Sequence, residues 1–567
     1  MKKNKSSLSD LALSQPKTKK QTTAINFPLI LCLVSGLLTL WLYFVLAQLG
    51  ENAMSAVQPS GVLATSKRLM LLPLTQFDLV LTSFRQQLVI FFLGITLQLL
   101  LLAVVIRRLA CRRSQSGISG RTDNRRLGWV IFAFAVLFRL VTLPQTPWLS
   151  DDIYRYLWDG SVLANGINPF RYAPEAAELA PLRDAEIFPH VNHKKVITVY
   201  PPLLQALFWL AHQLGGSVIA MKALLIAADL ALVLLLFWAL PKLGTPSWWT
   251  ILYAWHPLAI IEIAGSGHVD GIGALFLFVA VALLALRRQE ITAVCCLALA
   301  FLVKFLSVLL VPFLFLRTPA ENTNWRHLFS QKSFRLLLIF VFIIFFSYLP
   351  FAGGNLISGL AVYAAKWRFN GSIFTLFYEP IHALLPDSLV IKLMVPAHWE
   401  ITNEVLITRR VDLALLITKI IMAAMLSGFL LLCWRNIRHS TPGKPNCFLP
   451  FAVFSLPLFW PALTLNLLGI FFLLSPTVQP WYLLWILPLM CLVRQPGWIT
   501  WSATIFLAYW ILDGYARTGL WQEPAWVKWM EYGVAGLAAV AARAWKRQTK
   551  LSVEPHRILP NLNEANK

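Results

Sequence analysis

Long apolar segments, separated by short polar or basic ones, run along almost the whole chain. Many approach the ~20 residues that a helix needs to cross a bilayer. The pattern predicts membrane spans at 27–49, 88–106, 128–143, 217–239, 248–263, 270–286, 335–350, 411–433, 449–474, 480–493, 498–512 and 527–543. The first span is longer than the apolar region of a cleaved signal peptide, which favours a membrane anchor. The sequence therefore predicts an all-α integral membrane protein with about 12–14 transmembrane helices.

Two further apolar segments fit more than one topology. Residues 200–214 are short and begin with Pro-Pro, whereas residues 290–316 are long and carry Lys304 at their middle. In one topology, 200–214 lies on or partly in the membrane and 290–316 is a hairpin of two short helices. In the other, each segment crosses once. The first places Arg287 in the cytoplasm and obeys the positive-inside rule better, although its arms of ~13 residues are short for a core of ~30 Å.

The composition supports a membrane protein and argues against a nucleic-acid-binding protein. Hydrophobic residues make up 58% of the chain, charged residues 13%, and the mean hydropathy is +0.65. The formal charge of +23 comes from basic clusters that flank apolar segments, as in cytoplasmic loops. No cluster carries interleaved aromatic residues, so nucleic-acid binding is not predicted. The seven cysteines form no C-x-x-C pattern, so no disulfide or zinc framework is predicted either.

The preferred topology divides the chain into four regions. They are a basic cytoplasmic tail (1–26), two N-terminal transmembrane helices with a basic cytoplasmic loop (27–126), a large transmembrane domain (127–545) and a second cytoplasmic tail (546–567). Two large outer loops, 144–199 and 351–410, belong to the third region. They are rich in Asn, Pro, Tyr and Trp and hold most of the candidate functional residues, with amphipathic helices expected at the membrane surface.

The stretch SDDIYRYLWDGSVLANG at 150–166 predicts a helix in the first outer loop. Ser150 or Asp151 supplies an N-cap, and Gly166 is a natural C-terminal stop. An apolar, aromatic face opposes a charged face formed by Asp152, Arg155 and Asp159, which is typical of a helix lying on the membrane surface. An ordinary interfacial helix explains this pattern. The alternative is a carboxylate that accepts a proton as a general base.

Two cations are candidates for binding an anion. Lys304 lies inside an apolar segment, where a charge is costly unless it is paired or hydrated. A lysine that snorkels to the interface is the other interpretation. Arg368, in the run KWRFN, has the fork geometry that suits phosphate, or it is a solvated loop charge.

A second polar turn and an aromatic pair complete the candidates. The run GSGHVD places His268 and Asp270 between two spans, where glycines alone explain a tight turn but not these two side chains. Trp481 and Tyr482 stand at the outer end of a span. They either stack on a sugar or belong to the interfacial aromatic belt.

Six stretches together resemble one family. They are SDDIYRYLWDGSVLANGINPFRYAPE, VNHKKVITVYPPL, LYAWHPLAIIEIAGSGHVDGIGALF, LALAFLVKFLSVLLVPFLF, KWRFNGSIFTLF and LLSPTVQPWYLLWILPL. Their order and spacing resemble those of bacterial GT-C glycosyltransferases of the type that uses polyprenol-phosphate-mannose. The resemblance runs from 127 to 515 and does not cover 1–126.

The resemblance implies a GT-C-type helical bundle in the bacterial cytoplasmic membrane, with its active site on the outer side. A hexose, mannose in the first place, would pass from a polyprenyl phosphate to a hydroxyl of a cell-envelope glycan or glycolipid, with inversion. The family's acidic pair matches Asp151 and Asp152. Of the two, we favour Asp151, because Asp152 shares its helix face with other charged residues. The remaining candidates for donor phosphate and substrate binding are Arg155, Lys304, Arg368, Tyr200, His268, Asp270, Trp481 and Tyr482.

Metal use and two other functions stay open at this point. Some GT-C enzymes use a divalent cation, but this sequence has no extended metal motif, so metal independence is favoured. His190 and His193 are interpreted as solvated loop residues. A transporter or flippase for a lipid-linked sugar is less favoured, because polar residues gather on one side and no internal repeat is visible. An envelope ligase that joins whole glycans differs only in the size of its donor.

Overall fold

The computed structural model describes residues 27–57, 84–115, 121–315, 331–396, 398–439 and 456–553. This part of the chain is almost entirely helical. It contains no β-strand, only an isolated bridge between Phe369 and Thr477. The predicted all-α class is confirmed. The cytoplasmic tail expected at 1–26, the end of the C-terminal tail and most of the basic loop after residue 316 lie outside the described residues.

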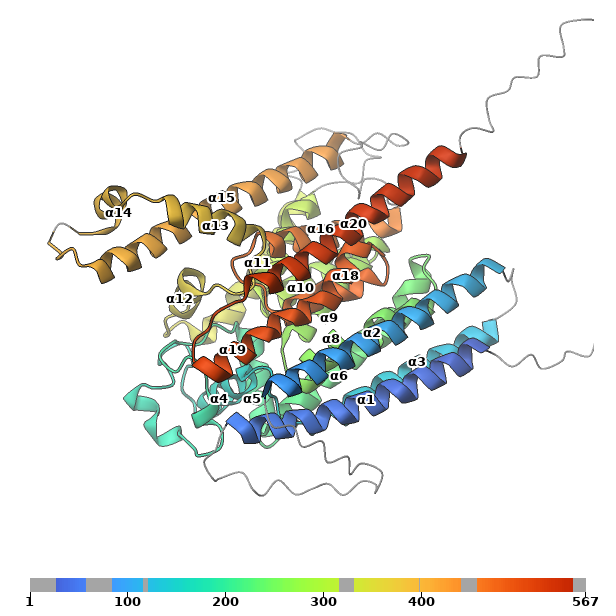
Figure 1. The fold of residues 1–567 in the computed structure, drawn as a ribbon, viewed down its shortest axis with the longest axis horizontal. Helices are drawn as coiled ribbons and strands as arrows, with labels where there is room; N and C mark the ends of the chain where they lie inside the picture. The colour runs from blue at the N-terminus through green and yellow to red at the C-terminus, as the bar shows by residue number, and fades with distance from the viewer. Residues whose placement is uncertain are drawn as a thin grey trace, which may run out of the picture.

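Six of the described helices are long and apolar enough to cross a membrane. They are α1 (Phe27–Val57), α2 (Phe84–Gln115), α6 (Val218–Lys242), α11 (Gln331–Tyr348), α15 (Asn403–His439) and α16 (Leu456–Leu474). Figure 1 shows α1, α2 and α3 (Arg121–Thr142) running side by side. The prediction of a polytopic membrane protein is confirmed, whereas the larger number of 12–14 spans stays a prediction.

The remaining α-helices complete the bundle and the loops, and all but α20 are short. They are α4 (Asp152–Ala164), α5 (Pro202–Gln213), α7 (Ile251–Ala254), α8 (Pro257–Ala259), α9 (Asp270–Ala285), α10 (Glu290–Phe301), α12 (Ser358–Lys366), α13 (Ile373–Leu384), α14 (Asp387–Met394), α17 (Leu487–Met490), α18 (Pro496–Thr504), α19 (Ile511–Thr518) and α20 (Ala525–Val553). The π-helix η4 (Ile260–Gly265) and the 3₁₀ helices η5 (Phe305–Phe315) and η8 (Pro480–Trp485) interrupt them.

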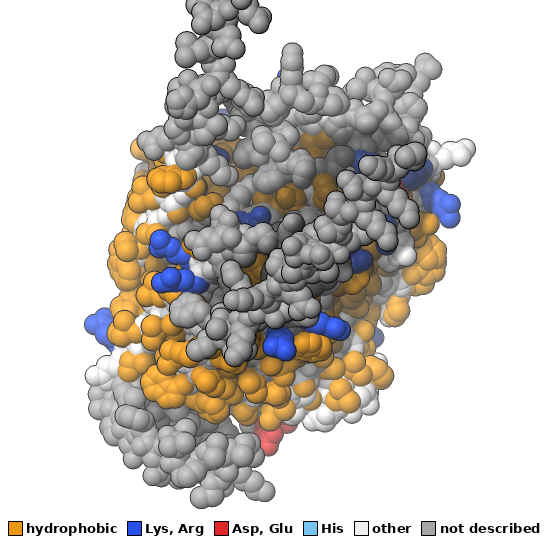
Figure 2. Space-filling model, turned by 90° about the vertical axis from the view of Figure 1, so that its right-hand side faces the viewer, with side chains coloured by type: hydrophobic (Ala, Val, Ile, Leu, Met, Phe, Trp, Pro, Cys, Tyr) orange, Lys and Arg blue, Asp and Glu red, His pale blue; other side chains and the backbone are white. Residues whose placement is uncertain are grey.

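Apolar side chains cover much of the molecular surface. Figure 2 shows them on the face at the right-hand side of Figure 1, together with scattered Lys and Arg side chains and little acidic charge. Soluble proteins rarely expose such large contiguous apolar areas. The exposed apolar side chains along the long helices, such as Leu37 in α1, Leu93 in α2 and Phe345 in α11, therefore suit contact with lipid.

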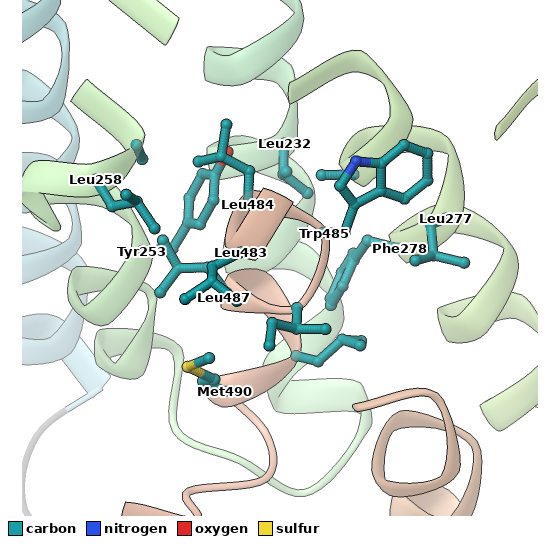
Figure 3. Close-up of a cluster of buried hydrophobic side chains, with 14 of the residues drawn as sticks. Leu232, Tyr253, Leu258, Leu277, Phe278, Leu483, Leu484, Trp485, Leu487 and Met490 are labelled. Carbon is teal, nitrogen blue, oxygen red and sulfur yellow. The ribbon is translucent and has the colours of Figure 1, made fainter. Parts of the chain in front are cut away.

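Three of the predicted spans are not continuous α-helices; the 3₁₀ helix η9 (Ile505–Trp510) interrupts 498–512, and two other spans break at prolines. Residues 248–263 break around Pro257 into α7, α8 and η4, and residues 480–493 form the short elements η8 and α17. Proline lacks an N–H group and cannot continue the helical hydrogen-bond ladder. Both segments nevertheless lie in the core, where Tyr253 and Leu258 pack near Leu484 and Leu487 (Figure 3). Irregular backbone at membrane depth is tolerated where protein covers it.

A buried ion pair ties α3 to α6, and the hydropathy pattern did not predict it. The Arg139 side chain binds the Asp229 carboxylate, and both side chains are fully buried. Arg139 also donates to the carbonyl oxygen of Ala254 at 2.9 Å, and the Tyr253 hydroxyl donates to Asp229 at 2.5 Å. The pair thereby joins three segments of the core.

The two ambiguous segments are short or interrupted, and whether each of them crosses a membrane stays a prediction. The α5 helix is short and packs against α4, with the Tyr156 and Phe208 rings stacked at 4.9 Å. Residues 290–316 break at Lys304 into α10 and η5. In the GSGHVD turn, a Cβ added to Gly267 would lie 2.4 Å from Ile153, so this turn packs against α4 rather than at the far end of the bundle.

The contact between α4 and α5 depends on Gly160. A Cβ at this position would lie 2.2 Å from the carbonyl oxygen of Phe208, and backbone cannot retreat easily. Gly160→Ala is therefore expected to destabilise the protein by about 1–3 kcal/mol. Thermal unfolding in detergent should show a lower Tm. Gly536→Ala in α20, where no atom lies within 4 Å, should leave the Tm unchanged, and an equal Tm for both variants would contradict the close approach.

Candidate active site

The acidic pair begins the first helix of the outer loop. The helix α4 starts at Asp152, two residues later than predicted, and ends before Gly166, whose φ of 75° suits glycine. The Ser150 hydroxyl accepts a hydrogen bond from the Asp152 N–H at 3.3 Å. Asp151 occupies the N-cap position but its side chain makes no capping bond. The carboxylates of Asp151 and Asp152 are therefore both available for other partners.

Asn192 bridges the two carboxylates. Its Nδ2 amide donates to Asp151 Oδ1 at 2.9 Å and to Asp152 Oδ1 at 2.7 Å. Surrounding protein desolvates the Asp151 carboxyl and raises its pKa, and the charge of Asp152 raises it further. The hydrogen bond from Asn192 opposes both effects, because it stabilises the charged form. The two carboxylates are thus held together as one coupled pair.

Arg155 has different partners from those that a phosphate-binding role needs. Its Nε donates to Asp159 Oδ1 at 2.9 Å and its Nη2 donates to the carbonyl oxygen of Val196 at 3.0 Å. Asp159 also accepts from the Thr198 hydroxyl at 2.5 Å. Arg155 and Asp159 are buried, so these contacts fasten α4 to the chain around Val196. The charged face of the predicted interfacial helix is in fact covered by protein.

The GSGHVD turn and the break at Lys304 form a second polar group. Lys304 Nζ donates to Asp270 Oδ1 at 2.9 Å, and the indole N–H of Trp485 donates to the same oxygen at 2.7 Å. The Asp270 side chain is buried, whereas 31% of the Lys304 side chain is exposed. Lys304, which the sequence singles out as a charge inside an apolar segment, is therefore paired with Asp270 and also partly accessible.

Lys304 lines a cavity of about 310 Å³. Its Nζ lies 3.6 Å from the centroid of the Tyr482 ring, a cation–π contact. The hydroxyls of Tyr482 and Tyr363 are 2.5 Å apart. Trp367 and several apolar residues, Phe305, Leu306, Val308, Leu309, Ala364, Phe471 and Pro476, line the rest together with Ser475 and Thr477. One cation thus faces a mainly apolar space with aromatic walls.

The GSGHVD turn packs against Ile153, the neighbour of Asp152, so the acidic pair lies near the pair formed by Asp270 and Lys304. The charge of Asp152 acts on Lys304 and on both tyrosines of the cavity wall, Tyr363 and Tyr482. Tyr200 also lies in the field of Asp152, and burial is the largest cause that raises the pKa of its hydroxyl. The fold therefore brings together the predicted residues Asp151, Asp152, Tyr200, Asp270, Lys304 and Tyr482, which come from separate stretches of the chain.

His268 and Trp481 lie side by side next to this group. Their rings stack with centroids 3.7 Å apart and an interplanar angle of 15°. His268 Nδ1 is 3.0 Å from Glu262 Oε2, and the Tyr509 hydroxyl donates to the same carboxylate. Trp481 is 9% exposed, and His268 covers one of its faces. Only the other face could meet a sugar.

Arg368 packs on an aromatic ring of α13. Its guanidinium sits 4.2 Å from the centroid of the Tyr378 ring on α13, and the residue is exposed. Its neighbour Trp367 lines the cavity instead, and it also contacts the His193 ring at 4.6 Å. The KWRFN run therefore contributes an aromatic side chain to the site. Trp367 and Tyr363 were not predicted as site residues. The only signal that the sequence offered is that Trp367 belongs to KWRFN and Tyr363 lies shortly before it.

No metal ligand set is evident in the described residues. Within them, no three His, Cys, Asp or Glu side chains come close enough to hold an ion. Of the two loop histidines, His190 packs on the Tyr154 ring at 4.8 Å and His193 packs on Trp367. Metal independence stays a prediction.

Comparison with known proteins gives one family and one relative. Residues 45–319 match the model of the MptA/B family, described as alpha-(1->6)-mannopyranosyltransferase, N-terminal domain. The chain is 25% identical over 237 residues to alpha-(1->6)-mannopyranosyltransferase A of Mycobacterium tuberculosis (strain ATCC 25618 / H37Rv). These matches confirm the predicted resemblance to GT-C mannosyltransferases, but the family match begins at residue 45, within the part that the resemblance was expected not to cover, and ends at 319. No solved structure matches the chain significantly.

The match covers only part of each protein. The aligned region amounts to 39% of this chain and 44% of the mycobacterial relative. The family match includes the acidic pair, Asp270 and Lys304. It ends before Tyr363, Trp367 and Tyr482, so those residues join the site on geometry alone.

Proposed function

We propose that the protein is an integral-membrane mannosyltransferase. It takes mannose from a polyprenyl phosphate and transfers it to a hydroxyl of a cell-envelope glycan or glycolipid. One observation carries the proposal: a bridged pair of carboxylates, Asp151 and Asp152, shares a site with the accessible cation Lys304 beside a mainly apolar cavity. The family match supports mannose as the sugar.

The residues support a single displacement with inversion. One carboxylate of the pair takes the proton of the acceptor hydroxyl while that oxygen attacks the anomeric carbon. The bond from this carbon to the phosphate oxygen breaks on the opposite face, which inverts the configuration, as in inverting glycosidases. The lipid phosphate leaves as an anion and needs no proton. Lys304 is the cation that meets its developing charge.

The cavity suits a lipid-linked donor. Its wall is mainly apolar and contains Phe305, Leu309 and Phe471, so it can hold the first isoprene units of a polyprenyl chain. Lys304 in its wall then meets the phosphate. Trp367 and Tyr482 offer aromatic faces that suit a sugar ring or an isoprene unit.

We place the site on the outer side of the cytoplasmic membrane. The helices α2 and α3 meet at a basic stretch at the end of the bundle away from α4 (Figure 1). The end seen in Figure 2 carries Lys and Arg side chains and little acidic charge. By the positive-inside rule this end faces the cytoplasm, so α4 and the acidic pair face outward.

A transfer assay with purified protein tests the proposed function. Protein in detergent is mixed with radiolabelled polyprenyl-phosphate mannose and an alkyl α-mannoside as acceptor, since the matched family is described as forming α-(1->6) mannosyl linkages. We expect labelled disaccharide with inverted configuration. A transporter needs two compartments and would give no product in detergent. A ligase would transfer only larger glycans, and either result would overturn the proposal.

The pH dependence should report the coupled carboxylates. Burial and the charge of Asp152 raise the pKa of Asp151, so the pair takes up its first proton at a higher pH than an isolated aspartate. Transfer should fall as the pH decreases, because a protonated base cannot accept. Asp151→Asn removes the carboxyl whose pKa is raised, so the acid limb of kcat/KM should lie at lower pH in this variant. An unmoved limb would show that Asp151 does not titrate with the base.

A further inference from the structure

The loop that carries Trp367 is fixed by the C-terminal part of the chain through Asn370. This residue is 2% exposed and has a φ of 52°, in the left-handed region. Its Nδ2 amide donates to both carboxylate oxygens of Glu531 in α20, at 3.1 and 3.0 Å. Its N–H donates to Glu523 Oε2 at 3.0 Å, and its carbonyl oxygen accepts from the Tyr532 hydroxyl. Three residues in α20 or just before it therefore satisfy the polar groups of Asn370.

The same loop is joined to a second wall of the cavity. The Phe369 N–H donates to the Pro476 carbonyl oxygen at 3.1 Å, and the Val478 N–H donates back to Phe369 at 2.8 Å. The Thr477 hydroxyl donates to the Trp367 carbonyl oxygen at 3.1 Å. Because Trp367, Pro476 and Thr477 all line the cavity, a shift at Phe369 would move two of its walls together.

We propose that Asn370 is a positioning residue for the donor site. Held by Glu531, it fixes the loop that sets Trp367 and Tyr363 against Lys304 and Tyr482. The identity of the donor in this inference rests on the proposed function, whereas the contacts of Asn370 do not depend on it. It also gives the C-terminal helix α20, which lies outside the family match at 45–319, a part in donor binding.

The Glu531 carboxylate strengthens the case for one specific contact. It is fully buried, and the indole N–H of Trp501 also donates to it, at 2.8 Å. A buried carboxylate needs such donors, and the loss of one leaves a costly unsatisfied group. The buried Glu531 carboxylate therefore needs the amide donor that Asn370 supplies.

Exchanging the amide donor and the carboxylate acceptor between residues 370 and 531 tests the contact of Asn370 with Glu531. Asn370→Asp keeps the shape but sets a second carboxylate against Glu531. We expect the KM for polyprenyl-phosphate mannose to rise about tenfold, with a smaller change in kcat, because a misplaced wall weakens donor binding. Adding Glu531→Gln restores an amide facing a carboxylate. The double variant should return the KM to within about twofold of the wild type.

Two further variants separate positioning from folding. Asn370→Gly keeps the left-handed backbone and removes only the amide, so it should raise the KM while folding is retained. Asn466→Asp alters another buried asparagine, whose amide donates to the Ala462 carbonyl oxygen at 2.7 Å. This control should lower the Tm without changing the KM. Hydrogen–deuterium exchange at 363–370 should increase in the Asn370 single variants and recover in the double variant.

Two results would overturn the proposal. One is faster exchange at 363–370 with an unchanged KM, which would make the contact purely structural. The other is a raised KM that Glu531→Gln fails to restore. If the wild-type protein transfers no mannose, the proposed function fails separately. Binding of a fluorescent polyprenyl phosphate to the same variants then replaces the KM, and an equal Kd in all of them overturns the positioning role.

Discussion

Asp152→Asn is expected to lower kcat for mannosyl transfer by about 10³-fold, the middle of the range for a general base. Asn keeps the size of the side chain and can still accept from Asn192, but it cannot take a proton. Asp152 is partly buried, and its charge acts on Lys304 and the tyrosines of the cavity. The measurement is the initial rate at saturating donor, with the Tm as a check on folding.

Asp151→Asn is the matched control and should cost much less, about tenfold, because the hydrogen bond from Asn192 remains but loses its charged acceptor. The sequence favoured Asp151 because Asp152 shares a helix face with Arg155 and Asp159. In the structure Arg155 instead binds Asp159 and Val196, so that reason no longer holds. A larger loss for Asp151→Asn than for Asp152→Asn would restore the original assignment.

Most of the fold could be predicted because hydropathy reports burial in lipid or protein. It does not report regularity, so it did not predict that two of the expected spans are broken into short elements. Residues 248–263 and 480–493 are apolar because they are buried in the core, but Pro257 and Pro488 break them into short pieces. The break at Lys304 was predicted from topology, since a hairpin satisfied the charge rule. Arg139 and Asp229 were missed because each lies alone in its own segment and the pair exists only after folding.

The site could be predicted where a residue was locally anomalous. An acidic pair beside an aromatic helix, a lysine in an apolar segment and an aspartate in a glycine turn each stand out along the chain. Asn192 and Tyr363 do not, because loop asparagines and interfacial tyrosines are common. Their parts in the site depend on contacts across the fold. For Arg368 the sequence shows the cation but not the Tyr378 ring that it meets, and its part in donor binding stays a prediction.

Lys304→Met is expected to lower kcat about 10²- to 10³-fold, as for the loss of one group that stabilises developing negative charge. The same change leaves the buried Asp270 carboxylate without its cation. Breaking a buried pair costs about 3–5 kcal/mol, and we expect the lower end because 31% of the Lys304 side chain is exposed. The single variant therefore confounds catalysis with stability, since both the rate and the Tm should fall.

The double variant Lys304→Met with Asp270→Asn separates the two effects. The second substitution removes the unpaired charge and leaves an amide oxygen that still accepts from the Trp485 indole, so the Tm should recover most of its loss. The transfer rate should not recover, because the cation that meets the leaving phosphate is still missing. If rate and Tm recover together, Lys304 serves only to neutralise Asp270, and the leaving group must meet another cation. If the Tm recovers alone, the lysine acts on the phosphate, and its pairing with Asp270 is what allows a charge to stand in the wall of an apolar cavity.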